Sequence, residues 1–413
     1  MEESGPVTVQ DAGVNVAPGS SDDGWETPPR VAMDDGTGIQ LFKDGEALKA
    51  AFAAIEAAQH RVCMESYIFA SDDTGRAFAD LLSRKASRGV RVYVIYDSVG
   101  SIASDRRMFR DMARSGVRLQ EFHPIRPWEC RCSWRPFNRD HRKLLVIDND
   151  IAGMGGLNVG AEYAGSWVIH KGGGAENDIA NFWRDTAIGV TGPGARRFLH
   201  CFAKSWHYAA HGGRIRTAEF DDGTQDIGRP FEGNDLSILG SVPTRSSSLR
   251  ALLHRILGGA RSRIDMTMAY FAPDDDLVNA LCRAARRGVR VRLMVPSKTD
   301  VQILMTAARS FYEKLLTSGV EVYERRAVVL HAKTMAIDGR LSVVGSLNLD
   351  YRSIEYNLEL SAIIRSEAFG RQLHSLFDND VHYADRISLK QWRRRPVRDR
   401  VVQWAVSRAR YLL

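Results

Sequence analysis

Two stretches of the chain repeat one pattern: HRKLLVIDNDIAGMGGLN at residues 141–158 and HAKTMAIDGRLSVVGSLN at residues 331–348. Both read H-x-K-x4-D-x6-G-[GS]-L-N, so the His, Lys, Asp and Asn of the first stretch each have a counterpart in the second. In a chain of this composition an H-x-K-x4-D match arises by chance only about 0.02 times. Two matches in the same register therefore predict a duplicated domain with an equivalent set of functional residues in each half.

The pattern places a His and a Lys two positions apart at the start of an apolar strand, so both side chains lie on one face. The segment that follows begins a turn, where Ser, Asn or backbone N–H groups can bind an anion. Two such half-sites at a pseudo-twofold axis suit a phosphodiester: the lysines neutralise phosphoryl oxygens, one neutral His attacks phosphorus, and one protonated His donates to the leaving oxygen. The catalytic candidates are His141, Lys143, Asp148, His331, Lys333 and Asp338, and the candidates for phosphate binding are Asn158, Ser346 and Asn348.

Other interpretations of the motif are weaker. A single copy would equally fit a strand with a surface His and Lys, but the matched second copy disfavours that interpretation. The two His and the two Asp could hold a metal ion, but the Lys beside each His would repel a cation. We therefore expect no metal. The first copy has Gly156 where the second has Ser346, so a phosphate contact there has to come from backbone N–H groups.

The repeat extends well beyond the motif. RVCMESYIFA at 61–70 resembles RIDMTMAYFA at 263–272, and RGVRV occurs at both 88–92 and 287–291. Apolar strands alternate with helical stretches in both copies, which predicts an α/β fold with mixed, mostly parallel sheets. We expect a disordered acidic segment at 1–38, a first domain at 39–220, a linker at 221–236, a second domain at 237–385 and a basic amphipathic tail at 386–413.

Composition narrows the class of protein. The 413 residues are 44% hydrophobic and 26% charged, which provides for a globular core and excludes a fibrous or wholly disordered chain. Five Cys are too few and too scattered for a disulfide framework. The sequence has no run of 18 apolar residues and no secretory signal, so no membrane-spanning helix is expected. A net charge of +7 suits a partner that carries phosphate, either nucleic acid or an anionic membrane.

The tail holds nine Lys or Arg against one acid between residues 386 and 410. After Pro396, apolar residues such as Val397, Val401 and Trp404 recur at helical spacing, which indicates an amphipathic helix. Arg and Trp on such a helix favour an anionic membrane interface, although a helix docked on the core remains an alternative. A second basic and aromatic stretch at 122–141, with Trp128, Trp134 and Phe137, either lines the approach to the site or packs in the core.

The paired motif resembles that of the phospholipase D superfamily, and the resemblance covers nearly everything from about residue 39 to 385. FNRDHRK at 137–143, GSLNLDYRS at 345–353, YDSVGS at 96–101 and PSKTD at 296–300 are similar to bacterial cardiolipin synthases, in the form without N-terminal membrane helices. The resemblance implies duplicated phospholipase D-like α/β/α sandwich domains with the active site at their pseudo-twofold interface. It also implies transfer through a phosphatidyl-histidine intermediate without metal or cofactor.

Residue roles follow from the resemblance. It implies that His141 is the nucleophile and His331 the acid and base, whereas the symmetry of the sequence alone leaves the two open. The family keeps the motif acids Asp148 and Asp338, which are expected to secure the site by hydrogen bonds. Each His also needs a carboxylate that fixes its tautomer. The two acids that lead strand-like runs are the candidates, Glu359 before LSAII and Asp185 before TAIGV, unless they are merely solvated.

The expected reaction is cardiolipin synthesis, in which one phosphatidylglycerol donates its phosphatidyl group to the glycerol hydroxyl of a second phospholipid and glycerol leaves. The expected partners are phosphatidylglycerol and an anionic membrane surface, with no nucleic acid, and the expected location is peripheral at the bacterial inner cell membrane. Three alternatives stay open: hydrolysis or head-group exchange of the phosphatidylserine synthase type, a nuclease or phosphodiesterase of the same superfamily, and a non-catalytic binding module.

Overall fold

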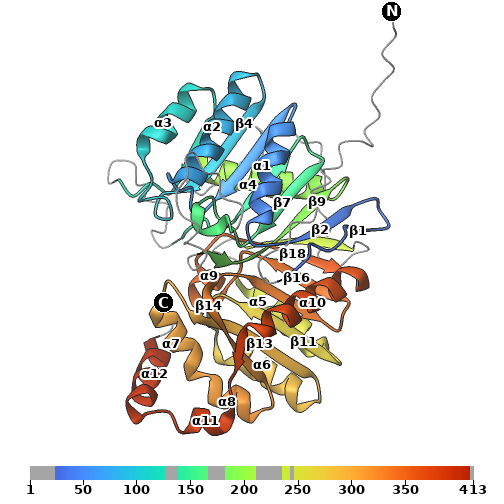
Figure 1. Ribbon diagram of the computed structural model, residues 1–413, viewed down its shortest axis with the longest axis vertical. Helices are drawn as coiled ribbons and strands as arrows, with labels where there is room; N and C mark the ends of the chain where they lie inside the picture. The colour runs from blue at the N-terminus through green and yellow to red at the C-terminus, as the bar shows by residue number, and fades with distance from the viewer. Residues whose placement is uncertain (1–23, 127–137, 166–181, 211–234, 242–245, 410–413) are drawn as a thin grey trace, which may run out of the picture.

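The computed structural model describes residues 24–126, 138–165, 182–210, 235–241 and 246–409 (Figure 1). It shows two α/β halves, one above the other in Figure 1, each built on a sheet with helices on both faces. The stretches 127–137 and 166–181, with the aromatic residues of the predicted approach to the site, lie outside the described residues. So do residues 1–23 and nearly all of the predicted linker.

The first half contains an eight-stranded sheet in the order β1-β2-β9-β7-β6-β3-β4-β5. Helices α1, α2 and α3 cover one face of it, and α4 packs on the other face. The strands are β1 (Val31–Ala32), β2 (Gly38–Lys43), β3 (Arg61–Ser66), β4 (Arg91–Asp97), β5 (Arg118–Phe122), β6 (Leu144–Ile147), β7 (Ile151–Gly155) and β9 (Thr186–Thr191). The helices are α1 (Glu46–Ala57), α2 (Asp73–Ser87), α3 (Arg106–Arg114), the short η2 (Ala161–Tyr163) and α4 (Ala195–Ala210).

The second half repeats this plan in the order β10-β18-β16-β15-β11-β13-β14-β19, and β8 of the first half joins beside β14. The strands are β8 (Trp183–Arg184), β10 (Leu236–Ser241), β11 (Arg263–Met268), β13 (Arg290–Lys298), β14 (Glu321–Leu330), β15 (Lys333–Ile337), β16 (Leu341–Gly345), β18 (Glu359–Arg365) and β19 (Ala384–Arg386), with β12 (Phe271–Ala272) and β17 (Leu349–Asp350) forming a separate pair. The helices are α5 (Ser246–Gly259), α6 (Asp275–Arg286), α7 (Gln302–Ser310), α8 (Tyr312–Thr317), α9 (Tyr351–Glu355), α10 (Glu367–His382), α11 (Leu389–Arg393) and α12 (Val397–Ala409).

The RGVRV repeat marks equivalent helix-to-strand junctions. Its glycines, Gly89 and Gly288, have φ of 91° and 93°, a left-handed conformation that other residues adopt only with strain. Each glycine ends a helix, α2 or α6, just before the strand β4 or β13. The two helices also begin alike, because Asp72 and Asp274 each accept a hydrogen bond from a backbone N–H of the first turn.

The sheets are mixed, as predicted, but the expectation that parallel pairs dominate is wrong. Parallel pairing is confined to β3-β4-β5 in the first sheet and to β11-β13-β14 with β8 in the second. Each motif forms an antiparallel hairpin, β6-β7 or β15-β16, and a further antiparallel strand follows it. The short turns after Asp148 and Asp338 dictate this outcome, because a parallel pair needs a crossover of a dozen or more residues.

One hydrophobic core joins the two halves. It contains side chains of α4 and the first sheet, such as Phe202 and Ile188, together with side chains of α10 and the second sheet, such as Leu373 and Leu360. A buried ion pair also crosses the interface: the Arg184 guanidinium binds both carboxylate oxygens of Asp380 on α10, at 2.9 and 2.8 Å. The halves are therefore packed as one unit, in which a removed partner would leave a buried charge unpaired.

The N-terminal segment differs from the expected disordered stretch where the structure describes it. Residues 24–38 are ordered: β1 pairs with β2, and Trp25, Val31 and Met33 are buried in the shared core. These three apolar side chains lie among the acidic residues whose charge dominated the prediction. Among the described residues, no helix is both long enough and apolar enough to cross a bilayer.

Candidate active site

The two motif histidines lie just before β6 and β15, on backbone that is hydrogen-bonded to the opposite half. The N–H of His141 donates to the carbonyl of Leu358 at 2.9 Å, just before β18 of the second half. The N–H of His331 donates to the carbonyl of Arg184 at 2.8 Å, in β8 of the first half. The halves thus fix each other's histidine backbone at the pseudo-twofold interface.

The carboxylates that orient the histidines are exchanged between the halves. His141 Nδ1 lies 3.0 Å from Glu359 Oε1, and His331 Nδ1 lies 2.7 Å from Asp185 Oδ2. A carboxylate at Nδ1 holds the proton there, so Nε2 of each ring keeps its lone pair for chemistry. Both acids are therefore buried and hydrogen-bonded, and each one contacts the histidine of the other copy.

The two carboxylates are supported differently. Glu359 accepts hydrogen bonds from the Ser346 hydroxyl and, at 3.3 Å, from the Asn357 amide. Asp185 accepts one from the Thr186 N–H at 2.7 Å, and a Cβ on Gly156 would lie only 2.1 Å from its Oδ1. The carboxylate of Asp185 thus occupies the space of the hydroxyl that the first copy lacks. Ser346 was predicted to bind the substrate phosphate, but its hydroxyl donates a hydrogen bond to Glu359.

Two buried lysines place positive charge between the histidines. Lys143 Nζ donates to the carbonyl of His141 at 2.7 Å, and Lys333 Nζ donates to the carbonyl of His331. Burial, only partly opposed by Glu359 and Asp185, lowers the pKa of Lys143 to about 7 and that of Lys333 to about 8. The ammonium groups are therefore held in a site that favours an incoming anion.

The imidazoles are neutral in the empty site. Burial and the lysines hold the pKa of His141 well below its usual range and lower the pKa of His331 to about 4. Asp185 opposes this lowering at His331 by its charge and its hydrogen bond. Burial also raises the pKa of Glu359 to about 7. A bound phosphodiester would add negative charge beside the lysines and imidazoles and so oppose the lowering of their pKa values.

Aromatic rings that sequence reasoning missed surround the imidazoles. The Tyr67 ring lies 5.1 Å from His141 and 5.3 Å from the Lys143 ammonium. Around His331 lie the rings of Trp183 at 5.1 Å, Tyr163 at 5.6 Å and Tyr270 at 6.3 Å. Tyr67 and Tyr270 lie in the repeated segments YIFA and AYFA, but at neighbouring rather than matching positions, so comparing the two copies residue by residue does not pair them.

The two motif asparagines have different surroundings. Asn158 accepts a hydrogen bond from the Ile68 N–H at 3.0 Å and donates one to the Tyr163 hydroxyl at 2.7 Å. Its amide is therefore used within the protein. Asn348 is also buried, but no hydrogen-bond partner for its Oδ1 is found among the described residues. Of the two, Asn348 keeps capacity for a substrate.

The motif aspartates lie at the far end of the strands, away from the histidines. Asp148 accepts hydrogen bonds from three consecutive backbone N–H groups at 2.6–2.7 Å, and Asp338 accepts three at 2.8–2.9 Å. Both have positive φ, 48° and 53°, at the turn after the strand. Their placement in the catalytic set is corrected: they tie β6 to β3 and β15 to β11 and so fix the strands that carry the histidines.

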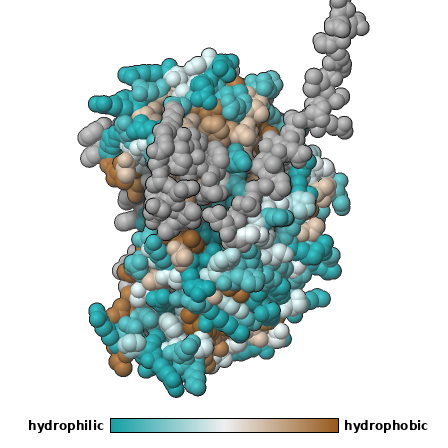
Figure 2. Space-filling model, viewed as in Figure 1, coloured by the Kyte–Doolittle hydropathy of each residue, from teal (hydrophilic) through white to brown (hydrophobic). Residues whose placement is uncertain are grey.

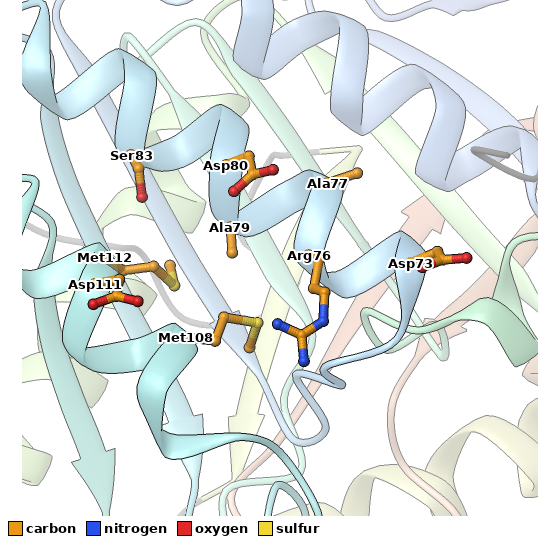
Figure 3. A pocket seen from close by; sticks show the side chains of 9 residues that line it. All are labelled: Asp73, Arg76, Ala77, Ala79, Asp80, Ser83, Met108, Asp111 and Met112. Carbon is orange, nitrogen blue, oxygen red and sulfur yellow. The ribbon is translucent and has the colours of Figure 1, made fainter. Parts of the chain in front are cut away.

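Other features of the described surface lie apart from this centre. The pocket in Figure 3 lies between α2 and α3, and its lining, which includes Arg76, Asp80, Met108 and Met112, contains no motif residue. We place the chemistry at the paired histidines, because buried titratable groups from both repeated motifs converge there. In the described part of the chain no group of three His, Cys, Asp or Glu side chains is arranged to hold a metal ion.

Similarity to known proteins agrees with this geometry. Residues 52–165 and 253–381 match the family described as "Cardiolipin synthase, PLD-like domain". A cardiolipin synthase of Geobacillus thermodenitrificans is 33% identical over 369 residues, which cover 89% of this chain and 70% of that protein. Cardiolipin synthase 2 of Bacillus anthracis is 30% identical over 365 residues, covering 88% of this chain and 68% of that protein. The crystal structure of phosphatidylserine synthase from Haemophilus influenzae shares the fold, with a TM-score of 0.71, 14% identity and coverage of 93% and 97% of the two chains.

The exchange of carboxylates predicts which histidine responds to each acid. Glu359→Gln should perturb the imidazole nitrogen signals of His141 and leave those of His331 in place, because Glu359 contacts His141. It should also lower kcat by about 10²- to 10⁴-fold with a small change in KM, since an amide favours the wrong tautomer. Imidazole ¹⁵N NMR and steady-state kinetics measure both effects. Glu367→Gln, an exposed acid just after β18, is the control. If Glu359→Gln shifted the imidazole signals of His331 and left those of His141 in place, the contact between Glu359 and His141 would be refuted.

The lysines predict how activity depends on pH. A lysine with a lowered pKa is charged below that pKa and neutral above it, so its neutralising charge is lost as pH rises. Because kcat/KM reports the free enzyme, it should begin to fall above about pH 7 as Lys143 deprotonates, and the fall should approach roughly 100-fold per pH unit above about pH 8, where Lys333 deprotonates as well. The bound phosphodiester should keep kcat flatter. A kcat/KM that stays constant to pH 10, with the melting temperature unchanged, would contradict the assigned pKa values.

Proposed function

Because the chain belongs to the phospholipase D-like cardiolipin synthase family, we propose that it transfers a phosphatidyl group from one phosphatidylglycerol to the glycerol hydroxyl of a second phospholipid. The observation that carries the proposal is the pair of carboxylate-bound imidazoles with a buried lysine beside each. This arrangement supplies a nucleophile, an acid and charge neutralisation in one water-poor site, which phosphodiester transfer requires.

In the first step, His141 Nε2 attacks phosphorus and the bond from phosphorus to the glycerol oxygen breaks. His331, protonated once the phosphodiester charge is bound, gives its Nε2 proton to the leaving glycerol. The hydrogen bond and charge of Asp185, which raise the pKa of His331, favour this role. His141 suits the nucleophile because its pKa is held low, so its lone pair is free. Lys143 and Lys333 neutralise the phosphoryl oxygens as charge shifts onto them.

In the second step, neutral His331 takes the proton of the acceptor hydroxyl, whose oxygen attacks phosphorus. The bond from His141 to phosphorus then breaks, and both imidazoles return to their starting state. The net products are cardiolipin and glycerol when the acceptor is phosphatidylglycerol. Water in place of the acceptor would give phosphatidic acid, and serine would give phosphatidylserine, so the acceptor decides between the main function and its closest alternative.

The reaction and its single site are tested together. Purified protein with phosphatidylglycerol vesicles should form cardiolipin and glycerol in equal amounts, measured by mass spectrometry of lipid and water phases. His141→Ala and His331→Ala should each reduce turnover by at least about 10³-fold, and the double variant should be no worse, because the residues act as a unit. Phosphatidic acid without cardiolipin would establish the hydrolase alternative. Added serine tests head-group exchange in the same assay.

We also propose that the protein acts as a peripheral protein on the anionic inner cell membrane, with α12 in contact with lipid. Helix α12 packs on α7, with Val406 directed toward Leu304. Its outward side exposes Val397, Val401 and Trp404 to 71%, 59% and 62%. Figure 2 shows hydrophobic atoms among hydrophilic ones in the region of α12, at the lower left.

The sequence left open whether the tail docks on the core or faces a membrane, and the structure has one part of the tail docked and another part exposed. Trp392 on α11 is docked, with its ring 4.8 Å from that of Tyr312, and Arg395 pairs with Glu313. Trp404 on α12 faces outward, with the Arg408 guanidinium 5.6 Å from its ring. Exposed arginines surround the apolar stripe, as on helices that bind anionic lipid surfaces: Arg394, Arg398, Arg400 and Arg408.

A paired substitution tests the outward face of α12. Val401→Ser with Trp404→Ser should weaken binding to phosphatidylglycerol vesicles about tenfold in high salt, where apolar insertion is unscreened. The melting temperature should stay within about 1 °C, because both side chains are exposed. Trp392→Ala is the matched control and should lower the melting temperature. Vesicle sedimentation with unchanged binding of the double variant would refute contact through α12.

A further inference from the structure

The two halves differ at one position just after the parallel strands β4 and β13, on the side of the site. After β4 the first half has Ser101, which is buried, donates to the Tyr67 carbonyl and accepts from the Phe69 N–H. At the corresponding place after β13 the second half has Asp300, which is exposed. The first half therefore closes this position by internal hydrogen bonds, whereas the second presents a carboxylate.

Asp300 is held in place by a tyrosine that lies against His331. The Tyr270 hydroxyl is 2.7 Å from both Asp300 carboxylate oxygens, and the Tyr270 ring meets the His331 ring edge-on at 6.3 Å. The Thr299 hydroxyl donates a further hydrogen bond to Asp300 Oδ1 at 3.1 Å. A carboxylate has about four lone-pair sites, so the exposed Asp300 can accept further hydrogen bonds.

The charge of Asp300 reaches both sides of the interface. Burial first, and Asp300 among the further causes, raises the pKa of Tyr163 and Glu162 of the first half. Burial lowers the pKa of Lys333, and the charge of Asp300 partly opposes this effect. Asp300 therefore lies at the junction of the halves, on the His331 side of the site.

The Asp300 carboxylate would repel the phosphodiester, which the lysines bind in the proposed reaction. It can instead accept hydrogen bonds from the uncharged hydroxyls at the end of the head group. His331 exchanges its proton with the oxygen that links glycerol to phosphorus, so the glycerol has to lie on the His331 side. Its two remaining hydroxyls are hydrogen-bond donors of the kind that a fixed carboxylate accepts. Building on the proposed transfer reaction, we infer that Asp300, positioned by Tyr270, binds the free hydroxyls of the glycerol head group.

The inference predicts selection among donors that differ only in the head group. Phosphatidylglycerol and phosphatidylpropanol share the phosphodiester, but only the former carries the diol. Wild-type protein should consume phosphatidylglycerol with a kcat/KM about 10- to 100-fold higher, the range of a lost hydrogen bond to a charged group. Asp300→Asn and Asp300→Ala should bring the ratio close to one by lowering kcat/KM for phosphatidylglycerol alone. Tyr270→Phe, which keeps the ring on His331, should lower the ratio partially.

Total donor consumption is the readout, because it counts cardiolipin and phosphatidic acid alike. If only phosphatidic acid forms, the proposed transferase function fails, but the donor ratio still tests Asp300. Asp276→Asn on α6 is the control and should leave the ratio unchanged. The inference is overturned if the wild type does not discriminate, if neither donor is consumed, or if Asp300→Asn slows both donors equally. Phosphatidylethanolamine is assayed as a third donor, and the inference is also overturned if Asp300→Asn lowers the consumption of that donor alone, because the carboxylate would then bind an ammonium group.

Discussion

The exchange of orienting carboxylates between the halves is the contact on which the site depends. His141 takes its tautomer from Glu359 of the second half, and His331 takes its own from Asp185 of the first. Neither half alone therefore holds a histidine whose Nε2 is prepared for chemistry. The shared core and the buried pair of Arg184 and Asp380 follow from this requirement, since an exchange at about 3 Å tolerates little movement between the halves.

The burial of the site between the two packed halves also determines its electrostatics. Two lysines and two histidines are buried together, and burial lowers the pKa of all four groups despite the two carboxylates beside them. In such surroundings the substrate's own phosphodiester completes the charge balance, and its arrival raises the pKa values that burial had lowered. In the proposed transfer, the chain thus obtains an acid from a histidine that is neutral in the protein alone. Substrate binding and the protonation of His331 are linked in this way, without a further group.

Much of the site could be read from the sequence, because two matched motifs 141–158 and 331–348 exclude coincidence. The duplicated mixed α/β fold and the two carboxylates were also within reach, since strand alternation and strand-leading acids are local patterns. The sequence could not predict that Asp185 and Glu359 each contact the histidine of the other half. Spacing along the chain carries no information about which half a side chain faces. The motif aspartates share the spacing of the histidines, but the strand β6 lies between His141 and Asp148 and places the aspartate at its opposite end. Antiparallel pairing was missed because it is decided by the short turn after that residue.

The contact between Gly156 and Asp185 has a consequence for the descent of the two halves from one ancestor. A duplicated gene starts with identical copies, yet here one copy has a glycine and a short acid where the other has Ser346 and a longer one, Glu359. A single step back toward symmetry at Gly156 would drive a Cβ to 2.1 Å from the Asp185 carboxylate. A return from Gly156 to serine must therefore be accompanied by a second substitution that moves or removes the Asp185 carboxylate. Divergence at this position is hard to reverse. The two copies have ceased to be interchangeable, and each can specialise in its own half of the reaction.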